Sequence, residues 1–208
     1  MTERALTLRL VSLLLSYPDS ELLAGRDELT EAVRTLPDSP QRDRLLAFAG
    51  WFTAAAPEEL ARHYVEMFDL RRRSSLYLTY YLHGDTRRRG MALLLLKQRY
   101  RVAGLVPPEG ELPDFLPVVC EFAALEGTRG EAPLRQHRRG IELIRTALHD
   151  AGSPYAAVLD ALAAALPELS EQERAEVAAL ALDGPPDEEV GLAPFAPPEY
   201  MCGTESRA

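Results

Sequence analysis

Apolar residues recur every three or four positions along nearly the whole of this 208-residue chain. This spacing places them on one face of an α-helix. Leu6, Leu10 and Leu13 begin the first such stripe, and Pro18 closes it. No segment alternates polar and β-branched residues as a half-buried strand would. The sequence therefore predicts an all-α fold, a single-domain bundle of about nine to eleven helices over residues 1–182.

Prolines and small polar residues indicate where the remaining helices begin and end. These helices are expected near residues 19–33, 45–56, 57–68, 76–82, 86–103, 113–123, 134–148, 154–166 and 171–182. Residues 183–208 show no periodic stripe and are rich in proline, glycine and acidic side chains. This composition predicts a flexible tail with little structure of its own.

The cysteines and the N-terminal residues both indicate the cellular compartment of the protein. Cys120 and Cys202 are far apart and form neither a disulfide framework nor a zinc motif, which favours a reducing environment. Glu3 and Arg9 interrupt the apolar N-terminal stretch, so it does not read as a signal peptide or a membrane span. We expect a cytoplasmic protein without stable membrane insertion.

The charge is unevenly distributed along the chain. The formal net charge is −9, yet residues 71–101 hold nine lysine and arginine residues against one acidic residue, Asp85, a local charge of +8. General nucleic-acid binding favours broad positive surfaces, so one basic island in an acidic protein suits an anionic patch on a protein partner better. A helical adaptor or regulator that binds nucleic acid stays as an alternative, with strongly salt-dependent DNA binding as its signature.

Signatures of catalysis are largely missing. The chain has no glycine-rich phosphate loop, no H-E-x-x-H and no G-x-S-x-G. Asp69 and Asp85 each adjoin an arginine triplet, which favours ion pairs over acid–base roles. The four histidines are expected to be partly exposed on helices, and Cys120 to be a buried, inert thiol. An all-helical enzyme with an unfamiliar site stays as the second alternative, and turnover of a small metabolite would reveal it.

Tyrosine and arginine are concentrated between residues 63 and 101. These two side chains are enriched where proteins bind partners. The alternative interpretation is a set of core aromatics beside a solvated arginine face.

Two segments in this region carry a resemblance to a known family. They are FDLRRRSSLYLTYYLHGDTRRRGMALLLLKQRYRVAGL at residues 68–105 and ELPDFLPVVCEFAAL at residues 111–125. Together with the opening LLSYPDSELL, they resemble the assembly chaperones of respiratory nitrate reductase, the NarJ group or delta subunit. That group belongs to the broader molybdoenzyme chaperones that include TorD and DmsD.

The resemblance implies a TorD-like helical fold, no catalytic turnover and no cofactor or metal of its own. It implies that the chain binds the N-terminal segment of the reductase's catalytic (alpha) subunit in the cytoplasm. The chaperone would hold that subunit while its iron–sulfur cluster and molybdenum cofactor are inserted, and would contact molybdenum cofactor delivery proteins. A chaperone for another molybdoenzyme is the nearest alternative.

One residue departs from the family pattern. The wider family favours histidine after the acidic residue of its E-x-P-D-H segment, whereas this chain has Phe115 after Asp114. A role for that histidine therefore does not carry over. The matching positions are Glu111, Pro113, Asp114, Leu116 and Glu121.

We expect a groove that accepts an amphipathic client helix, lined by Tyr64, Phe68, Tyr77, Tyr80 and Tyr81. Alanine at Tyr64 or Phe68 is expected to weaken client binding and to leave the fold intact. The full predicted binding set is Tyr64, Phe68, Asp69, Arg71, Arg72, Arg73, Tyr77, Tyr80, Tyr81, His83, Gly84, Asp85, Arg87, Arg89, Glu111, Pro113, Asp114, Leu116 and Glu121.

Overall fold

The computed structural model describes residues 2–84 and 86–183, and within these ranges the chain is all-α. No strand occurs in these ranges, only an isolated antiparallel bridge between Tyr77 and Phe115. The α-helices are α1 (Glu3–Leu14), α2 (Ser20–Ala24), α3 (Arg26–Arg34), α4 (Pro40–Ala54), α5 (Pro57–Tyr64), α6 (Tyr80–His83), α7 (Arg87–Val102), α8 (Leu116–Glu126), α9 (Ala132–Gln136), α10 (Arg138–Asp150), α11 (Tyr155–Ala165) and α12 (Glu171–Asp183). The predicted all-α class is confirmed. Asp85 and residues 184–208, which hold nearly all of the predicted tail, lie outside the described residues.

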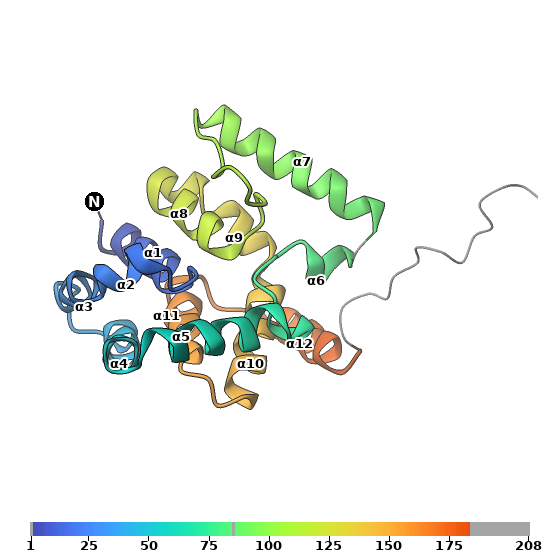
Figure 1. The fold of residues 1–208 in the computed structure, drawn as a ribbon. Helices are drawn as coiled ribbons and strands as arrows, with labels where there is room; N and C mark the ends of the chain where they lie inside the picture. The colour runs from blue at the N-terminus through green and yellow to red at the C-terminus, as the bar shows by residue number, and fades with distance from the viewer. Residues whose placement is uncertain (1, 85, 184–208) are drawn as a thin grey trace, which may run out of the picture.

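One large apolar core holds the bundle together. Helix α1 packs on α8 and α11, and α11 also packs on α4 and α10 (Figure 1). Tyr155 at the start of α11 is fully buried and lies at the centre of an aromatic cluster. Its ring centroid is 4.9 Å from that of Phe48, 4.8 Å from Phe68 and 5.9 Å from Tyr64.

Tyr64 and Phe68 therefore belong to the core, where they are 4% and 5% exposed. The Tyr64 hydroxyl donates to the Leu15 carbonyl at 3.1 Å, and burial raises the pKa of this phenol. Truncating a buried aromatic side chain to alanine costs about 3–5 kcal/mol of stability. Both side chains pack inside the bundle, so alanine at either position should lower the free energy of unfolding, which the sequence did not lead us to expect.

Several helix boundaries differ from the prediction. The helix expected near residues 19–33 is divided at Gly25 into α2 and α3, and the stripe at 134–148 is divided at His137 into α9 and α10. Helix α8 begins at Leu116 and not at Pro113. Of the helix expected at 76–82, only the part from Tyr80 onward forms. The residues before it form a bend at Leu76, a bridge at Tyr77 and a turn at Leu78 and Thr79, because they pair with another segment.

That pairing joins Leu76–Thr79 to Asp114–Leu116, and we refer to these residues as the clasp. The Leu78 amide donates to the Asp114 carbonyl at 3.1 Å, and the Leu116 amide to the Leu76 carbonyl at 2.8 Å. The Asp114 side chain is fully buried, and one of its oxygens accepts from the Thr79 amide at 3.0 Å and the Thr79 hydroxyl at 2.5 Å. The clasp thus joins the segment before α6 to the segment after α7.

Helix α7 lies at one edge of the molecule, above α8 and α9 in Figure 1. It is held by a second, small core of Leu96 and Tyr100 against Val118 and Phe122 of α8. The rings of Tyr100 and Phe122 are 4.3 Å apart, and the Tyr100 hydroxyl donates to the Pro113 carbonyl at 3.1 Å. Most of the rest of α7 is exposed.

His137, between α9 and α10, departs from the expectation of partly exposed histidines. It is 3% exposed, and its Nδ1 is buried without a hydrogen-bond partner among the described residues. Burial, reinforced by electrostatic interaction with His83 and Arg99, lowers the pKa of His137 to about 4. The imidazole is therefore neutral at physiological pH.

We predict that Asp114→Ala loosens the clasp. The Thr79 amide would lose its acceptor in a buried setting, so the free energy of unfolding should fall by about 2–4 kcal/mol. Urea unfolding followed by circular dichroism measures this change. Asp69→Ala is the control, because Asp69 is exposed and should change stability little. Equal losses in the two variants would show that the clasp bonds are unimportant.

We also predict that His137 makes stability depend on pH. Between about pH 6.5 and pH 4 the unfolded chain binds a proton at this position that the folded protein does not, so the free energy of unfolding falls as the pH falls. The loss from about pH 7 to pH 5 should be near 2 kcal/mol. In His137→Gln the same comparison by urea unfolding should give a smaller loss, and an unchanged loss would contradict this role.

Candidate functional site

Several of the predicted binding residues meet in one hollow at the N-terminal end of α7. This hollow, the tyrosine pocket, has a volume of about 290 Å³. Its walls are Phe68, Asp69, Arg71, Arg72, Ser75, Tyr77, Tyr80 and Arg89. Tyr64 and Tyr81 are not among them, so the predicted groove of five aromatic residues does not form as expected.

Arg89 organises the aromatic side of the tyrosine pocket. Its guanidinium carbon lies 6.0 Å from the ring centroid of Tyr77 and 5.9 Å from that of Tyr80, within the range of cation–π attraction. Its Nε donates to the Thr79 hydroxyl at 3.3 Å, which connects the pocket to the clasp. The Tyr77 hydroxyl donates to Glu111 at 3.1 Å, and burial together with Glu111 raises the pKa of Tyr77 to about 12. The pocket therefore presents a protonated phenol beside fixed positive charge.

Tyr81 supports the pocket from inside the protein. Its hydroxyl donates to the carbonyls of Ser75 at 2.8 Å and Arg73 at 3.2 Å, which fixes the loop that carries the first arginine triplet. The ring packs against Gly140 of α10, where a Cβ atom would lie 3.0 Å from it. Gly84 ends α6 at φ 54°, a conformation that favours glycine.

The other predicted residues have structural contacts. Leu116 and Pro113 are buried in or beside the clasp. Glu121 forms an ion pair with Arg9 and so joins α8 to α1. An ion pair was expected between Asp69 and the neighbouring arginine triplet. Arg71 of this triplet pairs instead with Glu66 at 3.1 Å. Arg73 and Arg87 are exposed, and the predicted site residue Asp85 lies outside the described residues.

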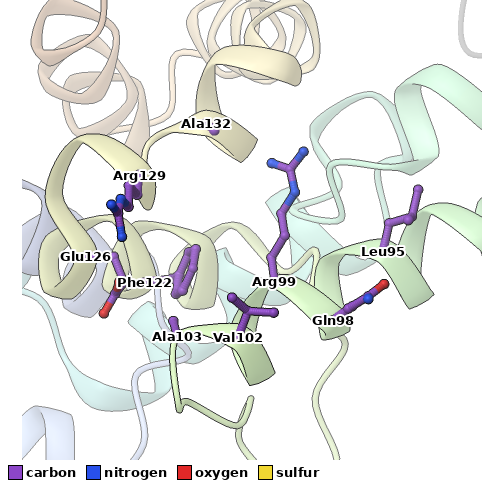
Figure 2. Close-up of a pocket in the computed structure, with 9 residues that line it drawn as sticks. All are labelled: Leu95, Gln98, Arg99, Val102, Ala103, Phe122, Glu126, Arg129 and Ala132. Atoms are coloured by element: carbon purple, nitrogen blue, oxygen red, sulfur yellow. The ribbon is translucent and has the colours of Figure 1, made fainter.

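A larger groove runs along the C-terminal half of α7. It has a volume of about 540 Å³, and we refer to it as the α7 groove. Figure 2 shows its walls: Leu95, Gln98, Arg99, Val102 and Ala103 from α7 and its end, facing Phe122, Glu126, Arg129 and Ala132. Apolar side chains form the floor and much of the wall, whereas Arg99, Glu126 and Arg129 supply charge.

The α7 groove was not predicted from the sequence. Leu95 is 59% exposed and Val102 84%, although both are apolar residues on a helix that already buries Leu96 and Tyr100. Met91 and Leu94 are exposed as well. The run of apolar residues from 91 to 96 is longer than one buried stripe requires, and this was the available signal. A contiguous exposed apolar surface of this kind is typical of a binding site.

A third hollow, of about 290 Å³, lies between the α7 groove and α6. We call it the histidine pocket; its walls are His83, Arg88, Met91, Ala92, Leu95, Leu96, Arg99, Gln136 and His137. It shares Leu95 and Arg99 with the α7 groove. All three hollows thus use α7 as a wall.

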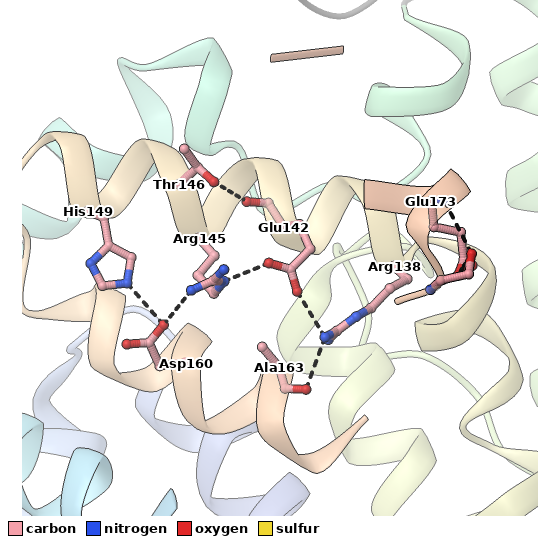
Figure 3. Close-up of polar contacts among 9 residues, drawn as sticks. Arg138, Glu142, Arg145, Thr146, His149, Asp160, Ala163 and Glu173 are labelled. Atoms are coloured by element: carbon pink, nitrogen blue, oxygen red, sulfur yellow. Dashed lines mark hydrogen bonds and ion pairs between the residues drawn. The ribbon is translucent and has the colours of Figure 1, made fainter. Parts of the chain in front are cut away.

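A network of charged side chains joins α10 and α11 (Figure 3). Glu142 pairs with Arg138 at 2.9 Å and with Arg145 at 2.6 Å, and Asp160 accepts from Arg145 and His149 at 3.0 Å each. Although burial opposes ionisation of Asp160, its hydrogen bonds from His149 and Arg145 lower its pKa. The lowered pKa keeps Asp160 ionised, so the network joins two helices and is poorly suited to general-acid catalysis.

The described residues contain no group of three or more histidine, cysteine or acidic side chains that could hold a metal ion. Cys120 is fully buried, and burial raises the pKa of its thiol, as expected for an inert cysteine. No helix in the same part of the chain is long and apolar enough to cross a membrane.

Comparison with known proteins gives consistent relatives. The chain is 35% identical over 176 residues to a "Probable nitrate reductase molybdenum cofactor assembly chaperone NarJ" of Bacillus subtilis, covering 84% of this chain and 96% of that protein. It is 33% identical over 162 residues to the "Nitrate reductase molybdenum cofactor assembly chaperone NarJ" of Escherichia coli K12, 74% of this chain and 66% of the relative.

A "Nitrate reductase-like protein NarX" of Mycobacterium tuberculosis is 43% identical over 146 residues, which cover 70% of this chain but only 22% of that longer protein. The family model described as "Nitrate reductase delta subunit" matches residues 27–161, a span that contains α4 to α10 and all three hollows along α7. The chain belongs to the nitrate reductase delta subunit family, whose relatives named above include nitrate reductase molybdenum cofactor assembly chaperones.

Proposed function

We propose that this protein is a cytoplasmic, non-catalytic chaperone that binds the N-terminal segment of the catalytic subunit of respiratory nitrate reductase. It holds that subunit while the iron–sulfur cluster and the molybdenum cofactor are inserted. The names of the relatives support the assembly role. The observation that carries the binding proposal is the α7 groove, with the exposed apolar side chains of Leu95 and Val102 in its wall.

The α7 groove has the properties that an amphipathic helix needs in a partner. Leu95 and Val102 offer exposed apolar contacts, Phe122 lines the groove although it is mostly buried, and Arg99 and Glu126 offer charges of both signs at the sides. In helix-in-groove recognition, apolar anchors at helical spacing enter such a groove while polar groups fix the register. The charged groups here can select the orientation of the bound helix.

Approximate energies support a reversible complex. If three apolar side chains of the client helix are buried, at about 1.5–3 kcal/mol each, the gross stabilisation is roughly 5–9 kcal/mol. Association and helix ordering cost several kcal/mol, and exposed ion pairs add about 0–1 kcal/mol each. The balance corresponds to an affinity of about micromolar strength, which holds a client and still releases it.

The tyrosine pocket provides a second, more polar contact at the other end of α7. Arg71 and Arg89 line it, and Arg87 lies exposed nearby in the chain, so the local charge suits acidic residues of the client. These arginines should increase the association rate more than the affinity, because exposed charges act chiefly through steering. The predicted binding residues in this pocket keep that role in the proposal.

The test is calorimetric titration with a peptide of about 20 residues, long enough for about five helical turns, from the N-terminus of the nitrate reductase catalytic subunit of the same organism. We expect binding at about micromolar affinity, lost with a scrambled peptide of equal charge. Failure of the folded, helical protein to bind this peptide would exclude the proposed client segment.

Leu95→Ser should weaken peptide binding by about 10- to 100-fold, because it removes an apolar side chain from the groove wall. Leu94→Ser is the matched control: Leu94 is the neighbouring residue, is 60% exposed against 59% for Leu95, and does not line the groove. Both variants should melt like the parent protein, since neither side chain is buried. Equal affinities of the two variants would place the client elsewhere.

A further inference from the structure

We propose that the histidine pocket binds a small organic phosphate, with its phosphate group held by Arg88, Arg99 and His137. This is a ligand site distinct from the groove proposed for the client helix. It shares only Leu95 and Arg99 with that groove, and its ligand is of a different chemical class.

The charge of the pocket is the first argument. Arg88 and Arg99 reach it from α7, His83 from α6 and His137 from the start of α10, and none of the described residues that line it is acidic. Neither arginine forms an ion pair with any residue in the described ranges. Two guanidinium groups without an ion-pair partner among the described residues suit an anion with several acceptor oxygens. Arginine favours phosphate because it donates two parallel hydrogen bonds.

The second argument is the buried Nδ1 of His137. His137 is 97% buried, since its exposed fraction is 3%, and this nitrogen has no hydrogen-bond partner among the residues that the structure describes. A buried polar atom without a partner is uncommon in native proteins and indicates a further partner, such as a water molecule or a bound ion. In the neutral ring, Nδ1 can carry the proton and donate it to a phosphate oxygen.

The third argument is size and lining. The volume of about 290 Å³ is about half that of the α7 groove and lies at the lower end of the range of small-molecule sites. Met91, Ala92 and Leu96 form an apolar wall beside the cationic groups. The organic part of a phosphate ester would cover this apolar wall, whereas a free phosphate ion would leave the wall uncovered.

Phenyl phosphate is a suitable probe because it joins one phosphate to one apolar ring. We expect saturable binding to the full chain in phosphate-free buffer, measured by calorimetry and by the imidazole signals of His137 in nuclear magnetic resonance spectra. Inorganic phosphate should bind at least about tenfold more weakly, since it lacks the apolar contact. Binding is measured without client peptide, so this test can fail while client binding succeeds, and the reverse.

Arg99→Gln should weaken phenyl phosphate binding by about tenfold or more, because it removes a charge-assisted hydrogen-bond donor. Arg101→Gln is the matched control, since Arg101 is an exposed arginine on the same helix that does not line the pocket. The proposal is overturned by the absence of saturable binding, by equal losses in the two variants, or by inorganic phosphate binding as tightly as phenyl phosphate.

Discussion

The carboxyl group of Asp114 accepts hydrogen bonds from both the amide and the hydroxyl of Thr79 in a part of the protein without contact with water. A buried polar side chain of this kind is stable only while its partners stay in place. The bonds therefore fix where the chain leaves the bundle and where it returns. Tyr77 and Tyr80, on either side of Thr79, are positioned by them, and so is Arg89, which donates to the same hydroxyl. The geometry of the tyrosine pocket therefore depends on the hydrogen bonds of the clasp.

The long helices were predictable because their apolar stripes repeat over several turns. The helix expected at 86–103 is α7 at Arg87–Val102, and the helix expected at 171–182 is α12 at Glu171–Asp183. The clasp was not predictable in the same way. Its two segments are too short for a period to be recognised, and their pairing depends on one carboxyl group meeting a threonine far away in the sequence. A prediction of helix at 76–82 was reasonable locally and failed because tertiary hydrogen bonds competed with it.

The candidate site shows a second limit of sequence reasoning. Tyr64 and Phe68 both pack around Tyr155, although Phe68 also lines the tyrosine pocket. Tyr77 lies in the wall of the same pocket and is only half-buried. An apolar period identifies a face of a helix, but it does not tell whether that face meets the core or a partner. Leu95 and Val102 illustrate the reverse case, because nothing in the spacing separates them from the buried Leu96 and Tyr100. The segment was identifiable as a binding region, whereas the individual walls required the packing of α7 against α8.

The closed loop between Thr79 and Asp114 has a consequence for how the protein can change over generations. The entropy cost of closing a chain segment grows only slowly with its length, so a turn added to or removed from α7 would cost the bundle little. The core around Tyr155 and the contacts of α1 with α8 and α11 lie outside this loop. Sequence drift in α7 can thus alter the reach and chemistry of an exposed surface while the rest of the fold is retained. The sequence of the core residues and the sequence of the exposed residues that contact ligands can therefore diverge at different rates.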